Sequence, residues 1–166
     1  MKMGTEKFAG FLGVFLSFAG SVTAFLIFLE RYFQVETETK SMILTRIAES
    51  GAKQEELLTL LVLPAAAVMV FFWITGILIY KLIFFIARVS VTDISLRLAL
   101  GSGYIVAFLL GTLLIERVPF LIVVVVTNLV EAAIIYFALY DQIREKIGVC
   151  LPFSCILLLV NVIFIL

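Results

Sequence analysis

Five stretches of this chain are both apolar and long enough to cross a lipid bilayer as helices. A hydrocarbon core about 30 Å thick needs roughly 20 helical residues. Strands cross a bilayer only as closed barrels, and the sequence lacks their alternating pattern. Of the 166 residues, 64% are hydrophobic and 14% are charged, whereas soluble domains average about 45–50% and 25%. The sequence therefore predicts an all-α polytopic membrane protein with five transmembrane helices in one bundle.

The predicted spans end where charged residues interrupt the apolar runs. They cover residues 8–29, 57–80, 98–115, 118–140 and 147–166, within a single transmembrane domain of residues 1–166. The polar loop 32–56 carries an apolar face at Ile43, Leu44 and Ile47, so we expect either a short helix in the membrane interface or a polar linker. Val22-Thr-Ala24 resembles a signal-peptidase cleavage site, but the apolar run continues past it. We therefore expect the first span to stay uncleaved.

Composition excludes several classes of function. The chain has no histidine, and its twelve basic residues balance twelve acidic ones. A histidine triad and a histidine-ligated metal are thereby excluded, and nothing attracts nucleic acid. Gly101-Ser-Gly103 lacks the preceding strand and the Gly-Lys-Ser/Thr of a phosphate loop. We expect no catalysis, no cofactor and no metal, and we interpret Cys150 and Cys155 as small apolar residues rather than a disulfide pair.

Small residues at every fourth position mark two spans. Helices in lipid associate by close backbone packing, which small residues allow. We expect the first and third spans to pack against each other or against a second copy through these residues, which are Ala9, Gly13, Ser17 and Ser21 in the first span and Ser95, Ala99, Gly103, Ala107 and Gly111 in the third.

Glu131 is an acidic residue in the middle of an apolar segment. An ionised acid at the bilayer centre costs roughly 2.5–3.5 kcal/mol on insertion scales, so such residues usually face protein or water. Thr127 and Asn128 precede Glu131 on the same helix face, and Ser154 and Asn161 share a face of the last span. The sequence leaves three interpretations: a hydrogen-bonded cluster with a protonated Glu131, a proton- or cation-coupled site, and a contact with a partner helix.

A binding site in this region would use Asn128, Glu131, Asn161 and Tyr104. Lys81 lies near the end of the second span, and an ion pair with Glu131 is one interpretation of it. Because a lysine at a helix end reaches the headgroups without a partner, we expect Lys81 to extend to the membrane surface.

From about residue 57 onward, the layout resembles the Yip family, five-span membrane proteins that interact with Rab GTPases in eukaryotes. The resemblance rests on the long second span closing in Phe71–Lys81, the polar turn Val89–Ser95, the small-residue helix Leu98–Tyr104, and Ala138–Gly148 opening into the last span. The proline that many members place after the third motif is absent, as is their long hydrophilic N-terminal region. The resemblance implies a non-enzymatic protein with a cytoplasmic N-terminus.

Slightly more basic residues fall on the side of the N-terminus, which likewise favours a cytoplasmic N-terminus and an external C-terminus. We expect the prokaryotic cytoplasmic membrane as the location. Besides the lipid bilayer, a membrane-protein partner or a second copy is the expected contact. We expect a scaffold or partner-binding module. The main alternative is a small transporter subunit or substrate-binding membrane component with a polar site around Glu131, and a third is an enzyme acting on lipid, which the lack of histidine and of paired acids disfavours.

Overall fold

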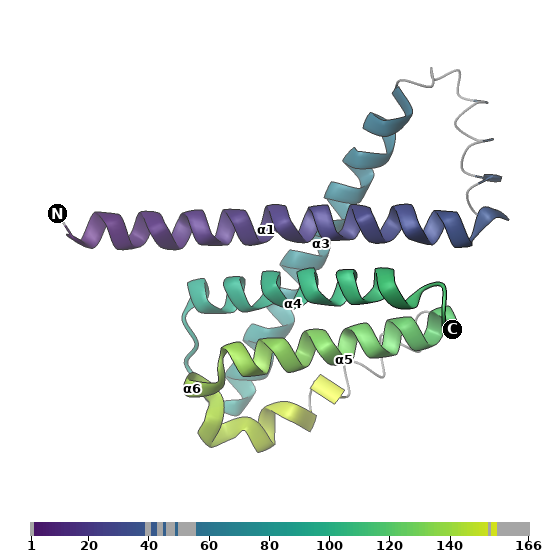
Figure 1. Ribbon diagram of the computed structural model, residues 1–166. Helices are drawn as coiled ribbons and strands as arrows, with labels where there is room; N and C mark the ends of the chain where they lie inside the picture. Colours follow the sequence, from purple (N-terminus) through teal and green to yellow (C-terminus); the bar gives the residue numbers. More distant parts are fainter. Residues whose placement is uncertain are drawn as a thin grey trace.

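The computed structural model describes residues 2–38, 41–42, 45, 49, 56–152 and 154–155. Every regular element in that part of the chain is a helix (Figure 1). The elements are α1 (Lys2–Val35), α3 (Glu56–Ala87), α4 (Asp93–Leu114), α5 (Phe120–Ala138), α6 (Tyr140–Ile143) and the 3-10 turn η1 (Arg144–Lys146). Residues 147–152 and 154–155 are also helical.

Four of these helices, α1, α3, α4 and α5, have the length and composition of membrane spans. Their outer faces are apolar: Phe85 and Phe137 are 80% and 85% exposed. Phenylalanines on the outside of a helix bundle are compatible with lipid rather than water around it. Most of the predicted fifth span, 147–166, and most of the loop 32–56 lie outside the described residues.

The helices are longer than the predicted spans at several of their ends. The first helix runs from Lys2 to Val35, so residues 32–35, which the sequence assigned to the loop, continue it. The second reaches Ala87, seven residues beyond its predicted end. The third begins at Asp93 rather than at residue 98 because the Thr92 side chain accepts a hydrogen bond from the Ser95 backbone N–H and caps the helix. Charged residues therefore mark the ends of the apolar runs rather than the ends of the helices.

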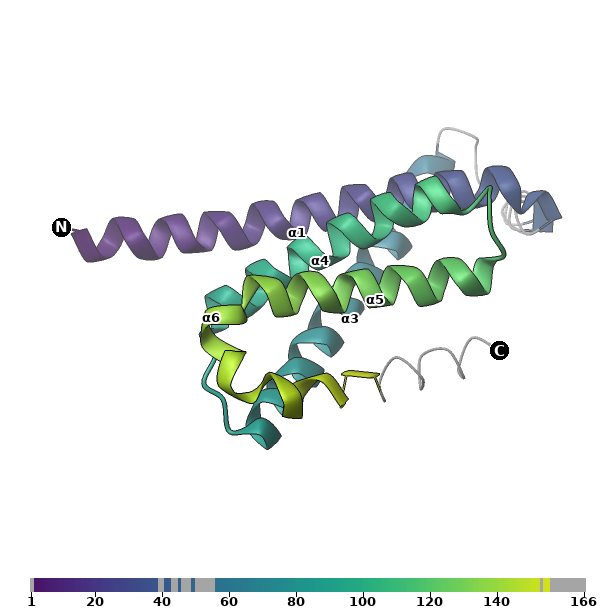
Figure 2. The same cartoon turned by 60° about the horizontal axis from the view of Figure 1, so that its bottom comes forward.

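The central helix of the bundle is α4, which contacts α1, α3 and α5. It runs parallel to α1, because Gly10 lies beside Ile94 and Gly20 lies beside Ile105. It runs antiparallel to α5, its neighbour on the other side (Figures 1 and 2). Parallel packing of α1 and α4 is the geometry expected of the first and third crossings of one chain.

The small residues of α4 allow both of these close approaches. Gly101 faces α1, where a methyl group added to it would overlap the Ser17 hydroxyl. The buried Ser21 donates a hydrogen bond to its own helix at Ser17 O (2.8 Å) and a longer one to Gly101 O (3.3 Å). Gly103 faces α5 instead, where an added methyl group would lie 3.1 Å from Glu131 Cγ. The contact between the first and third spans is present, with Ser17 against Gly101 and Phe28 against Gly111. The predicted ridge residue Gly103 packs on α5 instead.

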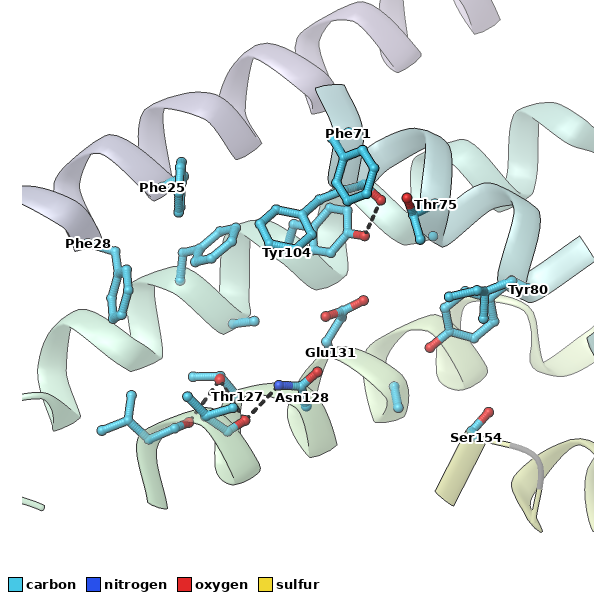
Figure 3. Close-up of a pocket in the computed structure, with 18 of the residues that line it drawn as sticks. Phe25, Phe28, Phe71, Thr75, Tyr80, Tyr104, Thr127, Asn128, Glu131 and Ser154 are labelled. Atoms are coloured by element: carbon cyan, nitrogen blue, oxygen red, sulfur yellow. Dashed lines mark hydrogen bonds between the residues drawn. The ribbon is translucent and has the colours of Figure 1, made fainter. Parts of the chain in front are cut away.

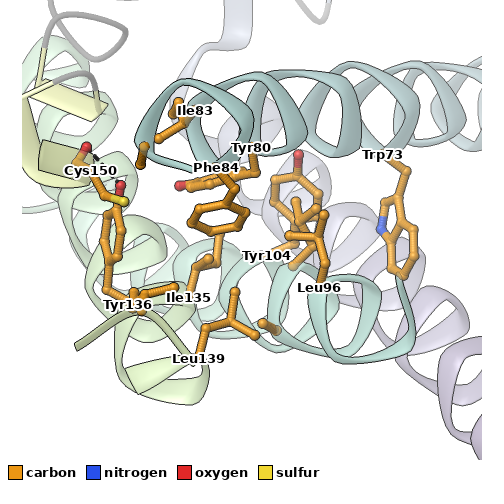
Figure 4. Close-up of a cluster of buried hydrophobic side chains, with 14 of the residues drawn as sticks. Trp73, Tyr80, Ile83, Phe84, Leu96, Tyr104, Ile135, Tyr136, Leu139 and Cys150 are labelled. Atoms are coloured by element: carbon orange, nitrogen blue, oxygen red, sulfur yellow. Dashed lines mark hydrogen bonds between the residues drawn. The ribbon is translucent and has the colours of Figure 1, made fainter. Parts of the chain in front are cut away.

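The remaining span, α3, crosses the other helices obliquely (Figures 1 and 2). Gly76 lets it approach α4, because a methyl group there would lie 2.8 Å from Leu100 Cδ2. The Trp73 ring meets Phe18 of α1 edge-on, with ring centroids 5.2 Å apart. Around these contacts lies the apolar core of the bundle (Figure 4), which includes Met69, Trp73, Phe84, Leu96, Leu100, Ile135 and Leu139.

Among the described residues, two ion pairs join the helix ends. Lys81 Nζ lies 2.9 Å from Asp93 Oδ1 and links α3 to the first turn of α4. Arg31 pairs with Glu116 at the opposite end of α4, at 2.7 Å. Lys81 thus pairs with Asp93 rather than with Glu131 and stays about half exposed, and its extension to the headgroups remains a prediction. Because the turn after α3 brings Asp93 back beside Lys81, the lysine has a protein partner that its helix position alone does not reveal.

The C-terminal end of α3 adopts a left-handed conformation at Arg88, whose φ is 55°. The Val89 N–H donates to Phe84 O at 2.9 Å, and the Arg88 N–H donates to Phe85 O at 3.1 Å. These bonds are those of a Schellman cap, in which glycine is the usual left-handed residue. The turn into α4 is therefore built with an arginine in a position that favours glycine.

Candidate functional site

A pocket of about 520 Å³ lies between α1, α3, α4 and α5 (Figure 3). The pocket is open because α3 crosses the bundle obliquely and stays apart from α5 over most of its length. The two helices meet at Tyr80 and Tyr136, whose ring centroids are 6.4 Å apart, and make few other contacts. Volumes of roughly 300–1,000 Å³ are typical of small-molecule sites. The lining consists of Phe25, Phe28, Phe71, Phe72, Thr75, Gly76, Ile79, Tyr80, Tyr104, Ala107, Phe108, Phe120, Val123, Val124, Thr127, Asn128, Glu131, Ala132 and Ser154.

One face of α5 supplies a polar strip to this lining. Thr127, Asn128 and Glu131 follow one another at helical spacing, so their side chains share that face. Thr127 Oγ1 donates to Val123 O at 2.8 Å, and Asn128 Nδ2 donates to Val124 O at 2.8 Å. Both of these hydrogen bonds are made to backbone carbonyls of α5 itself, while the three side chains line the pocket.

Glu131 is the one charged residue among the described residues that line the pocket. It lies near the middle of α5 and is partly buried. Figure 3 shows its carboxylate pointing into the space between Tyr104 and Tyr80. Among the residues that the structure describes, no hydrogen bond or ion pair satisfies the Glu131 carboxylate. The pocket therefore contains an acid whose oxygens face the open space.

Tyr104 reaches the pocket from α4 and is held from the side of α3. Its hydroxyl donates a hydrogen bond to the Phe72 backbone carbonyl at 2.9 Å. Gly76 makes room for the ring, because a methyl group at Gly76 would come within 2.5 Å of the Tyr104 hydroxyl. With its proton used on Phe72, the hydroxyl presents its lone pairs to its remaining neighbours.

Aromatic rings form most of the remaining wall. Phe108 of α4 contacts Phe25 and Phe28 of α1, with ring centroids 5.0 Å and 5.9 Å apart, and stacks with Tyr104 at 6.2 Å. On the far side, Phe71 of α3 is 65% exposed although it lines the pocket. The pocket therefore extends to the outer surface of the bundle, where an apolar residue of α3 meets the surroundings.

At the base of the pocket, Ser154 is hydrogen-bonded to the Tyr136 hydroxyl, which also donates to Cys150 O at 3.0 Å. These bonds attach the segment after η1 to α5. Cys150 is buried there, Cys155 is exposed, and both are free thiols. The sequence-based interpretation of the two cysteines as separate residues agrees with this geometry.

Three of the four residues predicted for a binding site line the same pocket. Tyr104 comes from α4, and Asn128 and Glu131 come from α5. Asn161 lies outside the described residues. Sequence reasoning missed Tyr80, Thr75 and the phenylalanine wall, because aromatic and threonine residues are common in apolar helices and no spacing separates those of the pocket from those facing lipid.

The described residues contain no group of three or more histidine, cysteine, aspartate or glutamate side chains suited to a metal. The described lining of the pocket offers one acid, hydroxyl oxygens and aromatic faces. Comparison of the chain with protein-family models, curated proteins and solved structures gives no match.

Proposed function

We propose that this protein is a membrane-embedded binding component, such as a small transporter subunit, that takes a small amphipathic molecule into the pocket around Glu131. The supporting observation is the Glu131 carboxylate, which faces a cavity of about 520 Å³ with no bonding partner among the described residues. The proposed role is non-enzymatic, because the described lining pairs this acid with no base.

The open pocket supports this function over a scaffold role. A scaffold would use Glu131 in hydrogen bonds between helices and would close the space around it, since an unsatisfied acid inside a membrane is costly. Thr127 instead bonds within its own helix, and Glu131 is left facing the cavity. That arrangement favours a ligand over a partner helix.

An apolar route from the membrane supports the same proposal. Phe71, Phe72 and Phe120 line the pocket and are 65%, 43% and 41% exposed on the bundle surface. Phe71 and Phe72 belong to α3 and Phe120 belongs to α5, so the route lies between these helices. A molecule dissolved in the hydrocarbon region reaches the pocket by this side without crossing an aqueous phase.

Photolabelling of the full chain in lipid nanodiscs tests this function. The probe is a small neutral phenyl diazirine, and mass spectrometry locates the labelled residues. We expect labelling of the pocket residues Thr75 and Ala132 to saturate with probe concentration, because a site of fixed size fills. Labelling of the exposed Phe85 and Phe137 should rise linearly, because lipid-facing residues meet only dissolved probe.

Two neighbouring alanines of α5 provide matched variants. Ala132 lines the pocket, whereas Ala133 is exposed and lies outside the lining. Ala132→Phe should remove the saturable labelling at Thr75, and Ala133→Phe should leave it unchanged. Linear labelling at every site of the unaltered chain, or saturable labelling that survives Ala132→Phe, would contradict the proposed function.

A further inference from the structure

We infer that the ligand of this pocket is a lipophilic organic monocation. Its charge is neutralised by Glu131, and its apolar part packs against the surrounding aromatic rings. This inference rests on the proposed function and assigns its ligand class. Glu131 is the single charged residue of the described lining, so a singly charged cation neutralises the site. The charge compensation that the described residues do not supply comes from the bound molecule, which offsets the cost of an acid at this depth.

The hydroxyl groups of the pocket support a cation for a second reason. Tyr104 Oη donates its proton to Phe72 O at 2.9 Å, and Thr127 Oγ1 donates to Val123 O and Val124 O at 2.8 and 3.1 Å. A hydroxyl has one proton and two lone pairs, so both groups offer acceptors once that proton is used. The hydroxyl oxygens of Tyr104 and Thr127 therefore present partial negative charge to a ligand, of the same sign as the Glu131 carboxylate.

The aromatic wall adds a third contribution of the same sign. The faces of Phe and Tyr rings carry negative electrostatic potential and attract cations, by roughly 0.5–1 kcal/mol at exposed sites and about 2 kcal/mol where water is excluded. Rings reach the pocket from four helices: Phe25 from α1, Tyr80 from α3, Tyr104 and Phe108 from α4, and Phe120 from α5. Carboxylate, lone pairs and ring faces therefore all favour positive charge.

The same lining disfavours an inorganic cation. Calcium takes six to eight oxygen ligands, and magnesium requires near-octahedral oxygen geometry. The described residues bring a single carboxylate to a largely apolar space, and they form no group of three acidic, histidine or cysteine side chains. An organic cation instead packs its hydrocarbon part against the phenylalanines while its charged group lies near Glu131.

The test compares the binding affinities of ligands that have equal shape and different charge. Binding to the full chain in detergent is measured by calorimetry and by the fluorescence of Trp73, the one tryptophan of the sequence. Tetraphenylphosphonium and tetraphenylborate share a shape and carry opposite charges. Benzyltrimethylammonium and neopentylbenzene form a smaller pair of one cation and one neutral molecule. We expect each cation to bind at least tenfold more tightly than its counterpart.

Substitution at Glu131 identifies the source of this selectivity. Glu131→Gln should lower cation affinity at least tenfold, and Glu131→Asp, which keeps the charge, should retain the preference for cations. Glu30→Gln is the matched control, since Glu30 is exposed and outside the pocket lining. If Glu131→Gln does not fold, the paired ligands on the unaltered chain and on Glu131→Asp decide the question.

The outcomes separate the two proposals. Saturable binding with equal affinity for cation and counterpart, or cation affinity that persists in folded Glu131→Gln, would overturn the ligand class and leave the proposed function standing. Absence of saturable binding for all four molecules would overturn the ligand class together with the pocket function. Binding of sodium or potassium ions in place of the organic cations would also overturn the inference.

Discussion

The Tyr104 hydroxyl donates a hydrogen bond of 2.9 Å to the backbone carbonyl of Phe72, and this contact joins α4 to α3 at the edge of the pocket. Gly76 follows Phe72 by one helical turn and leaves the space that the tyrosine hydroxyl enters. Tyr104, together with Leu100, thus helps to fix where the oblique helix crosses.

Tyr104→Phe should lower the free energy of unfolding by roughly 0.5–1.5 kcal/mol, the usual net contribution of such a bond. Unfolding of the purified protein in mixed detergent micelles measures this change. Tyr140→Phe is the control, because Tyr140 is 52% exposed and lies outside the pocket. Equal stability of both variants would mean that the bond to Phe72 contributes nothing.

Alanine at two glycines should have effects of opposite sign. A methyl group at Gly101 would overlap Ser17 and lie 3.0 Å from the Trp73 ring, so Gly101→Ala should destabilise the bundle by about 1–3 kcal/mol. Nothing lies within 4 Å of the corresponding position at Gly148, which is helical. Gly148→Ala should therefore stabilise by up to about 1 kcal/mol through helix propensity. Denaturation in micelles compares the two, and destabilisation at both positions to the same extent would contradict the packing described.

Cysteine pairs should report the parallel direction of α1 and α4. Gly10 lies beside Ile94, and Gly20 lies beside Ile105. With Cys150 and Cys155 replaced by alanine, oxidation should link cysteines placed at 10 and 94, and likewise those at 20 and 105. The exchanged pairs, 10 with 105 and 20 with 94, should remain unlinked. Cross-linking of the exchanged pairs on reducing and non-reducing gels would show an antiparallel contact instead.

The ion pair between Lys81 and Asp93 should contribute modestly, because both side chains are about half exposed. A double-mutant cycle of Lys81→Gln and Asp93→Asn should give a small favourable coupling energy that falls with added salt. Asp93→Asn should cost more than Lys81→Gln, since Asp93 also lies in the first turn of α4 and interacts with the positive helix end. Zero coupling at low salt would contradict a paired Lys81.

Replacing Arg88 should show the strain at the end of α3. Its φ of 55° is readily adopted by glycine and disfavoured for other side chains. Arg88→Gly should therefore raise stability by about 1 kcal/mol, whereas Arg88→Val should lower it by more, because a branched side chain tolerates this conformation least. Unfolding of both variants under the same micelle conditions measures the difference, and a destabilised Arg88→Gly would mean that the arginine side chain outweighs the backbone strain.

The apolar runs of the sequence determined the helices themselves. A backbone in hydrocarbon must satisfy its own hydrogen bonds, so long apolar runs become helices whatever surrounds them. The same local geometry placed Thr127, Asn128 and Glu131 on one face, because three- and four-residue steps bring helical side chains together. The helix ends were less predictable, since they depend on caps such as Thr92 and on turns such as Arg88.

Tertiary structure alone decided what faces that polar strip. No period within α3 encodes its oblique crossing, which follows from where Gly76 admits Tyr104 and Leu100 of another helix. That crossing separates α3 from α5, opens the pocket and brings Tyr104 to the same cavity as Glu131, while Lys81 turns to Asp93. Contacts between helices depend on the shapes of two surfaces at once, and the sequence of either helix contains only one of them.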